Sequence, residues 1–546
     1  MSESKLLRGT FVLTLGTYIS RILGMLYVIP FYALVSKIGG ALYSYGYGQY
    51  TIFLFISTAG FPLAVSKFVS KYNSLGDYHT GRRMLKSGLL VMSIMGVLGF
   101  LLLFSLAPFL AEIVLGGSGD EHGNKIEDVI LVMRMVSVAL IVVPMMSLIR
   151  GFFQGYQSMG PTAVSQVVEQ VVRIIFLLGS SFVIMKLLDG EIATAVAFST
   201  FSAFIGALGG LAVLILYWYK RKPYLDQMLE NSRPASVMTT KEMYKELLSY
   251  AGPFVFVGLA IPLYQYVDQF TFNRAMVRIG QADVAEELFG MVNLYVPKLV
   301  MIPVSLATAF GLTLVPTITN SYTSGDFTTL RKQIDKTFQI SVLLVLPAVV
   351  GLSVLAYPAY ATFYEISEEG GRILRWYAPV AILFSFFTLT AAILQGINKQ
   401  KFAVISLAFG FILKMIFNIP FIVWFGEIGA ILATALGYTV SIAYSFWMIS
   451  RHAGYRFKFF VRRSFLMAIF AGIMTLSIFI VTHLFSYTFT YDDGKLYSVI
   501  ILLIGVGIGA IVYLYLSYRS HLLEKLMGNQ LDRILSRFKR KKAVEH

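Results

Sequence analysis

The 546-residue sequence contains no cysteine and few charged residues. Without thiols, the chain can form neither a disulfide bond nor a thiolate metal site. Charged residues make up 14% of the chain, whereas a soluble globular protein carries about 25%. Acids are the scarcer sign, with 29 Asp and Glu against 45 Lys and Arg. This composition argues against a soluble protein of several domains.

Nucleotide-binding motifs are also missing. The single Gly-Lys pair, Gly494-Lys495, lacks the glycine five residues before Gly494 that a P-loop requires. Gly505, Gly507 and Gly509 lie inside an apolar run, where glycines favour helix packing. The longest loops, near 220–246, are too short for a catalytic domain. We therefore expect no enzyme, no catalytic residue, no metal and no cofactor.

Apolar residues make up 57% of the chain, with a mean hydropathy of +0.72. They gather in runs of about 20 residues or more, long enough to cross ~30 Å of hydrocarbon as helices. The expected fold class is an all-α polytopic membrane protein with fourteen transmembrane helices. The predicted spans are 10–36, 45–70, 88–112, 127–149, 161–186, 192–219, 247–272, 288–319, 337–363, 373–395, 401–425, 428–450, 464–487 and 496–518.

Positive charge alternates between successive loops. Lys and Arg gather in every second loop and in the tail, as at 82–83, 220–222 and 539–542, whereas the intervening loops hold acidic pairs such as Glu368-Glu369. An excess of Lys and Arg marks the cytoplasmic side. We therefore predict that both termini are cytoplasmic, and we expect no nucleic-acid binding despite the net charge of +16.

Two loop segments recur six spans apart. Residues 76–83, which begin Gly-Asp, recur as 325–332, and the segment 154–157, Gln-Gly-Tyr-Gln, recurs as 395–398, Gln-Gly-Ile-Asn. Both matches join equivalent cytoplasmic loops, so the repeat is parallel, which is a transporter architecture with the substrate between the two halves. The second register places Arg173 opposite Lys414.

This repeat defines the predicted domains. They are an N-terminal six-helix lobe over 1–220, a cytoplasmic linker over 221–246, a C-terminal six-helix lobe over 247–455, two extra helices over 456–518 and a basic tail over 519–546. The tail has leucines at helical spacing between its bases, which is typical of a helix on the anionic cytoplasmic leaflet. A solvated charge run that helps set topology is the alternative.

Few charged residues fall inside the predicted spans. A charge at the bilayer centre costs at least ~2.5 kcal/mol, so such residues usually face a bundle interior or a wet cavity. Away from the ends of the spans, they are the bases Arg21, Lys67, Arg134, Arg173, Lys298 and Lys414 and the acids Glu169 and Asp268. Because bases outnumber acids, the interior is cationic and suits an anionic substrate such as a phosphate or pyrophosphate.

Structural roles compete for several of these positions. Glu169 lies four residues before Arg173 on the same span, so the two can neutralise each other. Lys414 has a long stem that can reach a polar neighbour such as Asn418. Arg134, about two turns from the outer face, is equally compatible with a structural role and with substrate binding.

Arg21 and Lys298 are the strongest substrate-binding candidates. Arg21 has no acid in its own span. Lys298 lies between Pro297 and Pro303, where an interrupted helix commonly lines a cavity. Asp268 is a candidate partner for Lys298.

Several motifs resemble one exporter superfamily. They are 6–10, Leu-Leu-Arg-Gly-Thr; 20–24, Ser-Arg-Ile-Leu-Gly; 60–67, Gly-Phe-Pro-x-Ala-Val-Ser-Lys; 298–303, Lys-Leu-x-x-Ile-Pro; and 311–316, Gly-Leu-Thr-Leu-Val-Pro. Together they resemble the multidrug/oligosaccharidyl-lipid/polysaccharide (MOP) exporters, specifically the MurJ-type lipid II flippases and their YtgP branch. The likeness covers the whole chain.

The resemblance implies two lobes around a cationic cavity in the bacterial cytoplasmic membrane. By alternating access, this cavity would move lipid II, the undecaprenyl-pyrophosphate-linked peptidoglycan precursor, from the inner to the outer leaflet. Arg21 matches the family's span-one arginine, and Lys298 stands where MurJ proteins usually have an arginine. Spans thirteen and fourteen would form a groove for the undecaprenyl tail.

The sequence departs from the family pattern at three places. Tyr27 replaces a second span-one base, no acid lies within 39–48, and the span-two arginine is missing, which leaves Lys67 elsewhere on that helix. Arg173, Arg134 or Lys414 would then supply the missing charge.

Other functions remain as alternatives. The chain could export another undecaprenyl-linked saccharide, as sporulation and capsule branches do, whereas the cationic interior argues against extrusion of cationic drugs. A membrane glycosyltransferase would need a sizeable acidic loop, which is missing, and a scaffold would not need buried bases. The expected partners are a lipid-linked anionic substrate and membrane lipids. We expect a monomer driven by a coupling ion or the membrane potential.

Overall fold

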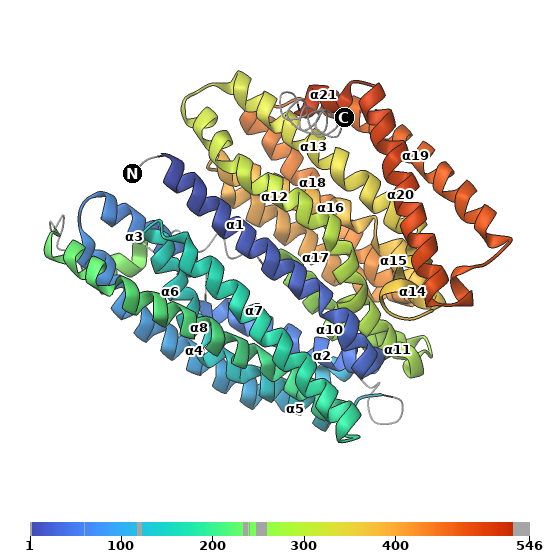
Figure 1. The fold of residues 1–546 in the computed structure, drawn as a ribbon, viewed down its shortest axis with the longest axis horizontal. Helices are drawn as coiled ribbons and strands as arrows, with labels where there is room; N and C mark the ends of the chain where they lie inside the picture. The colour runs from blue at the N-terminus through green and yellow to red at the C-terminus, as the bar shows by residue number, and fades with distance from the viewer. Residues whose placement is uncertain are drawn as a thin grey trace, which may run out of the picture. The chain divides into compact units, whose positions relative to one another are not determined.

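The computed structural model describes residues 3–58, 61–116, 123–232, 239, 241–246 and 259–527. Within these ranges every regular element is a helix. Contacts divide the chain into two compact units. The first unit contains residues 1–295 and 418–430, and the second contains 296–417 and 431–546. Figure 1 labels the helices and colours them by residue number, from blue at the N-terminus to red at the C-terminus.

The first unit is built from long helices and short helical turns. They are α1 (Glu3–Leu26), α2 (Val28–Thr58), α3 (Phe61–Ser74), α4 (Tyr78–Leu115), α5 (Ile126–Ser137), η1 (Val138–Ile141), α6 (Val143–Gly155), α7 (Met159–Phe182), η2 (Val183–Leu187), α8 (Ile192–Glu230), α10 (Ala260–Arg278), α11 (Ala282–Gly290) and η3 (Met291–Tyr295).

The second unit is also helical. Its elements are α12 (Val296–Thr323), α13 (Phe327–Val354), α14 (Ala356–Phe363), α15 (Glu368–Tyr377), α16 (Val380–Gly396), α17 (Gln400–Phe425), α18 (Glu427–Ala453), α19 (Lys458–Ser486), η4 (Tyr491–Asp493), α20 (Lys495–Arg519) and α21 (Leu522–Met527). The end of α17 and the start of α18 belong to the first unit.

Twelve helical stretches in the described part of the chain are long and apolar enough to span a membrane. Two features account for the difference from the fourteen predicted. The stretch Leu15–Thr58 runs through the predicted boundary between the first two spans, with a kink at Ser36 (φ 59°). Residues 247–258, in the seventh predicted span, lie outside the described residues. The expected all-α polytopic membrane fold is confirmed.

The first repeated segment forms the same helix boundary twice. Asp77 caps α4 by accepting a hydrogen bond from the amide of Thr80 (2.9 Å), and Asp326 caps α13 by accepting one from the amide of Thr329 (3.0 Å). The Thr329 hydrogen bonds also lower the pKa of Asp326. Each cap follows a glycine in the left-handed conformation that glycine favours: Gly76 (φ 76°) and Gly325 (φ 74°).

The second repeated segment also forms one turn twice, after α6 and after α16. Gln157 and Asn398 are left-handed, with φ of 56° and 57°. In both turns the next amide donates to a carbonyl in the preceding helix, Ser158 to Phe153 at 2.9 Å and Lys399 to Leu394 at 2.7 Å. The local conformation therefore repeats with the sequence.

Small residues let the helices of the first unit pack closely. Figure 1 shows α1 running alongside α7, which also packs on α8. A β-carbon at Gly16 would lie 2.8 Å from the side chain of Ala163, and one at Gly206 would lie 2.8 Å from the carbonyl of Glu169. Close backbone approach through small residues is a common way to associate helices in lipid, where the hydrophobic effect is weak.

The start of the basic tail packs against protein, whereas the sequence predicts a helix on the cytoplasmic leaflet. Leu522 and Leu526, on α21, are 3% and 2% exposed, and α21 packs on α13 and α20 of the second unit. These two leucines therefore contact protein rather than the leaflet. The remainder of the predicted tail helix, from residue 528, lies outside the described residues.

Candidate functional site

Arg173 is held by tyrosines in the first unit. Its Nη1 donates to the hydroxyl of Tyr47 (3.0 Å) and its Nη2 to the hydroxyl of Tyr43 (2.9 Å). The guanidinium also lies over the Tyr47 ring, 4.8 Å from its centroid. Tyr43 and Tyr47 stack on one face of α2 because they are four residues apart. This arrangement fixes the guanidinium of α7 against α2.

Tyr27 joins the same network. Its hydroxyl lies 3.2 Å from that of Tyr43, so one tyrosine separates Tyr27 from Arg173. The Nε of Arg173 is buried and has no hydrogen-bond partner among the described residues. Tyr43 therefore links Tyr27 and Arg173 in one hydrogen-bond network.

Glu169 does not pair with Arg173, contrary to the sequence-based expectation. Its Oε2 accepts a hydrogen bond from Nη2 of Arg150 at 2.7 Å, in an ion pair with side chains 23% and 12% exposed. Arg150 lies on α6 and also donates to Ser165 (Nη2, 2.6 Å). The prediction missed this pair because Arg150 lies just beyond the predicted span 127–149, and its partner comes from the next helix.

Two glycines of α8 set the space around these charges. A β-carbon at Gly206 would lie 2.8 Å from Cβ of Arg173, and one at Gly210 would lie 3.1 Å from Nη2 of Arg150. Without those side chains, α7 approaches α8 closely enough to hold both bases in fixed positions.

Arg21 lies at the edge of the α1–α7 contact. On α1, Thr17 donates to the side chain of Gln166 (3.1 Å) and Ser20 to its carbonyl (3.1 Å), so these neighbours face α7. Arg21 is exposed and makes no hydrogen bond or ion pair with the residues that the structure describes. Its charge is therefore available to a ligand.

Arg134 lies in the last turn of α5, and its guanidinium is 4.7 Å from the centroid of the Phe104 ring on α4. Its Nε is buried without a partner in the described part of the chain. Among the described residues, no hydrogen bond, ion pair or cation–π contact joins Arg134 to Arg173, Tyr43 or Tyr47.

Asp268 lies in a buried polar layer between α10 and its neighbours. The carboxylate is 5% exposed, and its Oδ1 accepts from Nδ2 of Asn418 at 2.9 Å. Nearby, Gln49 of α2 donates to Gln269 of α10 at 3.2 Å. The expected pairing of Asp268 with Lys298 stays a prediction, because the two residues belong to different units.

The second unit holds the other two bases. Lys414 is fully buried, and its Nζ donates to the hydroxyl of Thr434 at 2.7 Å. The neighbour predicted for it, Asn418, donates instead to Asp268 and to Thr271. Lys298 is half-buried on α12, shortly after the π-helical turn η3.

An apolar cavity of about 420 Å³ also lies within the second unit. It is formed by α12, α13, α19 and α20, and its lining includes Pro303, Pro347 and Met474. Gly505 and Gly509 of α20 pack tightly, since β-carbons there would lie 2.8 Å from Leu355 and 2.9 Å from Ile478. The prediction that this glycine pattern serves helix packing is confirmed for these two residues.

The sequence prediction missed Tyr43, Tyr47, Arg150 and Thr434. A signal for the tyrosines was present: Tyr43, Tyr45, Tyr47 and Tyr50 form an aromatic run with polar hydroxyls inside an apolar span. For Arg150 and Thr434, no local pattern identifies the partner.

Comparisons with known proteins identify the family. The model of the Polysaccharide biosynthesis protein family matches residues 6–322, which is more than half of the chain, and the MatE model matches residues 253–419. The chain is 56% identical to Lipid II flippase MurJ of Bacillus subtilis (strain 168) over 97% of this chain and 98% of that protein. It is 23% identical to Stage V sporulation protein B of the same organism, over 80% and 82%.

Solved structures show the same fold. A structure of Lipid II flippase MurJ in an inward closed conformation matches with a TM-score of 0.66 and 16% identity, over 94% of this chain and 99% of that one. An inward-facing multidrug resistance MATE family transporter matches with a TM-score of 0.59 and 17% identity, over 80% and 98%. The chain therefore belongs to the Polysaccharide biosynthesis protein family and is a relative of Lipid II flippase MurJ of Bacillus subtilis.

Proposed function

We propose that this protein is a multi-pass flippase of the bacterial cytoplasmic membrane that moves lipid II from the inner to the outer leaflet. The observation that carries the proposal is the 56% identity, over nearly the full length of both chains, with a protein named Lipid II flippase MurJ. The 56% identical relative is named a flippase, and the two matching solved structures are those of a flippase and a transporter. An undecaprenyl-linked saccharide of another kind is the second candidate, supported by the weaker match to Stage V sporulation protein B.

The pyrophosphate of the substrate is bound by the membrane bases. Arg21 is exposed and without a partner in the described part of the chain, so its guanidinium can hold phosphate oxygens in a bidentate manner. Arg173 supplies the charge that Tyr27 does not, with Tyr43 and Tyr47 orienting it. Lys298, Lys414 and Arg134 are further substrate-binding residues in a transport cycle of alternating access, while Asp268 and Glu169 position neighbouring groups.

The lipid tail occupies the apolar cavity of the second unit. Its walls come from α12, α13, α19 and α20, and apolar side chains dominate the lining. A cavity of about 420 Å³ holds a segment of a long prenyl chain and leaves the remainder in the bilayer.

We also propose the finer topology: fourteen spans, two six-helix lobes in parallel repeat, two extra helices, and both termini in the cytoplasm. The recurrence of the Asp77 and Asp326 caps supports the repeat. The protein acts as a monomer without nucleic acid or cofactor. Because its sequence has no P-loop, a coupling ion or the membrane potential drives it.

Complementation tests the function. We expect the chain to restore growth when it is produced in Bacillus subtilis cells depleted of their lipid II flippases. Complementation of a sporulation defect without rescue of growth would favour the second candidate instead. A stably inserted chain that rescues neither defect would contradict both.

A further inference from the structure

A basic pocket of about 750 Å³ lies in the second unit, separate from the residues assigned to the transported substrate. The first turns of α13 contribute Arg331, Lys332 and Asp335, and the segment between α18 and α19 contributes Tyr455 and Arg456. The lining of the pocket therefore contains three bases and one acid.

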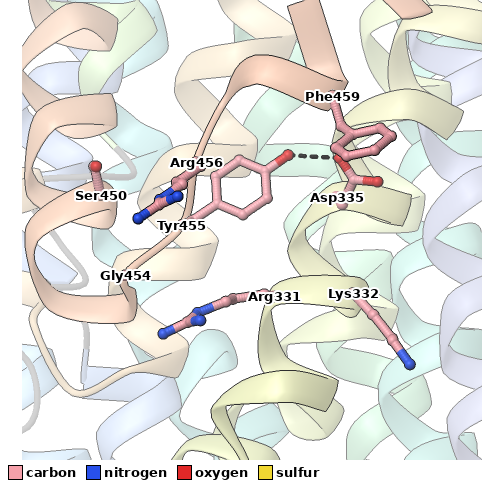
Figure 2. A pocket seen from close by; sticks show the side chains of 8 residues that line it. All are labelled: Arg331, Lys332, Asp335, Ser450, Gly454, Tyr455, Arg456 and Phe459. Atoms are coloured by element: carbon pink, nitrogen blue, oxygen red, sulfur yellow. Dashed lines mark hydrogen bonds between the residues drawn. The ribbon is translucent and has the colours of Figure 1, made fainter.

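The single acid is already engaged by neutral donors. Oδ1 of Asp335 accepts from the hydroxyl of Tyr455 at 2.7 Å (Figure 2), and Oδ2 accepts from Gln339. Burial, together with the adjacent Asp335, raises the pKa of Tyr455, so its hydroxyl keeps the proton that it donates. None of the three bases forms an ion pair with Asp335 among the described contacts.

The two guanidinium groups keep unused donors. Nε of Arg331 donates to the carbonyl of Ala453 (3.2 Å), which leaves its two terminal nitrogens without a protein partner in the described residues. Arg456 is exposed and makes no hydrogen bond there. Figure 2 shows both guanidinium groups on the side of Gly454, whereas Lys332 points away from them. Paired guanidinium forks match the geometry of phosphate oxygens.

Gly454 is required for this arrangement. Its φ is +61°, and a β-carbon there would lie 2.7 Å from Nη2 of Arg331. A side chain at this position would displace the guanidinium without changing the charge of the pocket.

Lipid-facing apolar residues border the pocket. Phe459, which lines it, is 66% exposed, and Phe465 farther along α19 is 68% exposed. On a membrane-spanning helix, such side chains contact acyl chains. A phosphate held by the two arginines can therefore carry lipid chains that run along α19. Basic pockets between membrane helices are a common way to bind anionic lipid headgroups.

We propose that this pocket binds a phosphate group, supplied by the headgroup of an anionic membrane phospholipid or by a soluble phosphate compound. The site is independent of the flippase assignment, since it uses none of the proposed substrate residues. It is tested by binding, without a transport assay.

The experiment uses the purified full-length protein and two probes. Phosphatidylglycerol in neutral detergent is titrated with native mass spectrometry as the readout, and inorganic phosphate is titrated at constant ionic strength with thermal unfolding as the readout. The test variants are Arg456→Gln, Arg331→Gln/Arg456→Gln and Gly454→Ala. Arg462→Gln is the matched control, because Arg462 is an exposed base at the start of α19 that does not line the pocket.

We expect the double variant to bind the phosphate ligand about tenfold more weakly, with smaller losses for Arg456→Gln and Gly454→Ala and none for Arg462→Gln. Arg456→Gln removes no internal contact and keeps the test valid if the double variant is unstable. Loss confined to phosphatidylglycerol assigns a lipid headgroup, and loss confined to inorganic phosphate assigns a soluble ligand. If the pocket variants bind each probe as tightly as the Arg462→Gln control does, the proposal is wrong.

Discussion

The position of Arg173 can be predicted from the sequence, but its hydrogen-bond partners cannot. The sequence identifies it as a base inside an apolar run, because a charge in such a run is readily recognised. It does not identify Tyr43 and Tyr47 as its partners, since these residues lie on a different helix. The same limitation explains the error at Glu169. The sequence suggests a pair with Arg173, four residues later on the same helix, but Glu169 forms its ion pair with Arg150 on a neighbouring helix.

Arg173→Ala should abolish complementation, because it removes the charge that we propose to bind the pyrophosphate. Tyr43→Phe removes the hydrogen bonds of its hydroxyl with Arg173 and Tyr27, each of about 1 kcal/mol, but leaves the charge, so we expect reduced rather than abolished activity. Growth rescue is measured together with the amount of inserted protein. Wild-type rescue by Arg173→Ala at normal protein levels would exclude Arg173 from the substrate site.

Arg21 and Lys298 should each be indispensable, since a charge in the membrane is costly unless it serves a function. We expect Arg21→Ala and Lys298→Ala to insert normally and to fail in complementation. Arg21→Lys should also be damaging, because an ammonium cannot reproduce a bidentate guanidinium contact, whereas Lys298→Arg should be mild. Full rescue by both alanine variants would show that the proposed anion site is wrong.

At the scale of elements, the apolar runs predicted most spans because length and hydropathy determine whether a helix can cross a bilayer. The kinked stretch Leu15–Thr58 escaped this reasoning. Lys37, Gly39 and Gly40 indicate a loop in the sequence, but the structure continues as a helix through all three residues. The repeated loops were more informative, since glycine and aspartate at a helix boundary have a defined backbone role.

The two equivalent caps should respond alike to the same substitutions. Asp77→Ala and Asp326→Ala should each lower the free energy of unfolding by about 1 kcal/mol, whereas the asparagine variants should be nearly neutral. The loss should be larger at Asp77, which is 1% exposed and also accepts from the hydroxyl of Thr80 (2.8 Å). Thermal unfolding in detergent measures the difference. Insensitivity of both sites to alanine would show that these caps do not stabilise α4 and α13.

For the whole molecule, membrane orientation follows from the distribution of charge, because the Lys and Arg excess marks the cytoplasmic side. A cysteine introduced at Gly119 or Asp493 should react with an impermeant thiol reagent in intact cells, and one at Gly76 or Gly325 should not. The natural chain contains no cysteine, so it provides an unlabelled background. Labelling of a cysteine at position 76 or 325 from outside the cell would contradict the fourteen-span topology.

The central claim, that the chain transfers lipid II across the membrane, is tested most directly by the leaflet distribution of lipid II. The measurement uses cells that depend on this chain and an impermeant probe that modifies only outer-leaflet lipid II. Depletion of the protein should leave lipid II on the inner leaflet, and the wild-type chain, but not Arg21→Ala, should restore the outer-leaflet fraction. An unchanged outer-leaflet fraction after complete depletion would contradict the assignment.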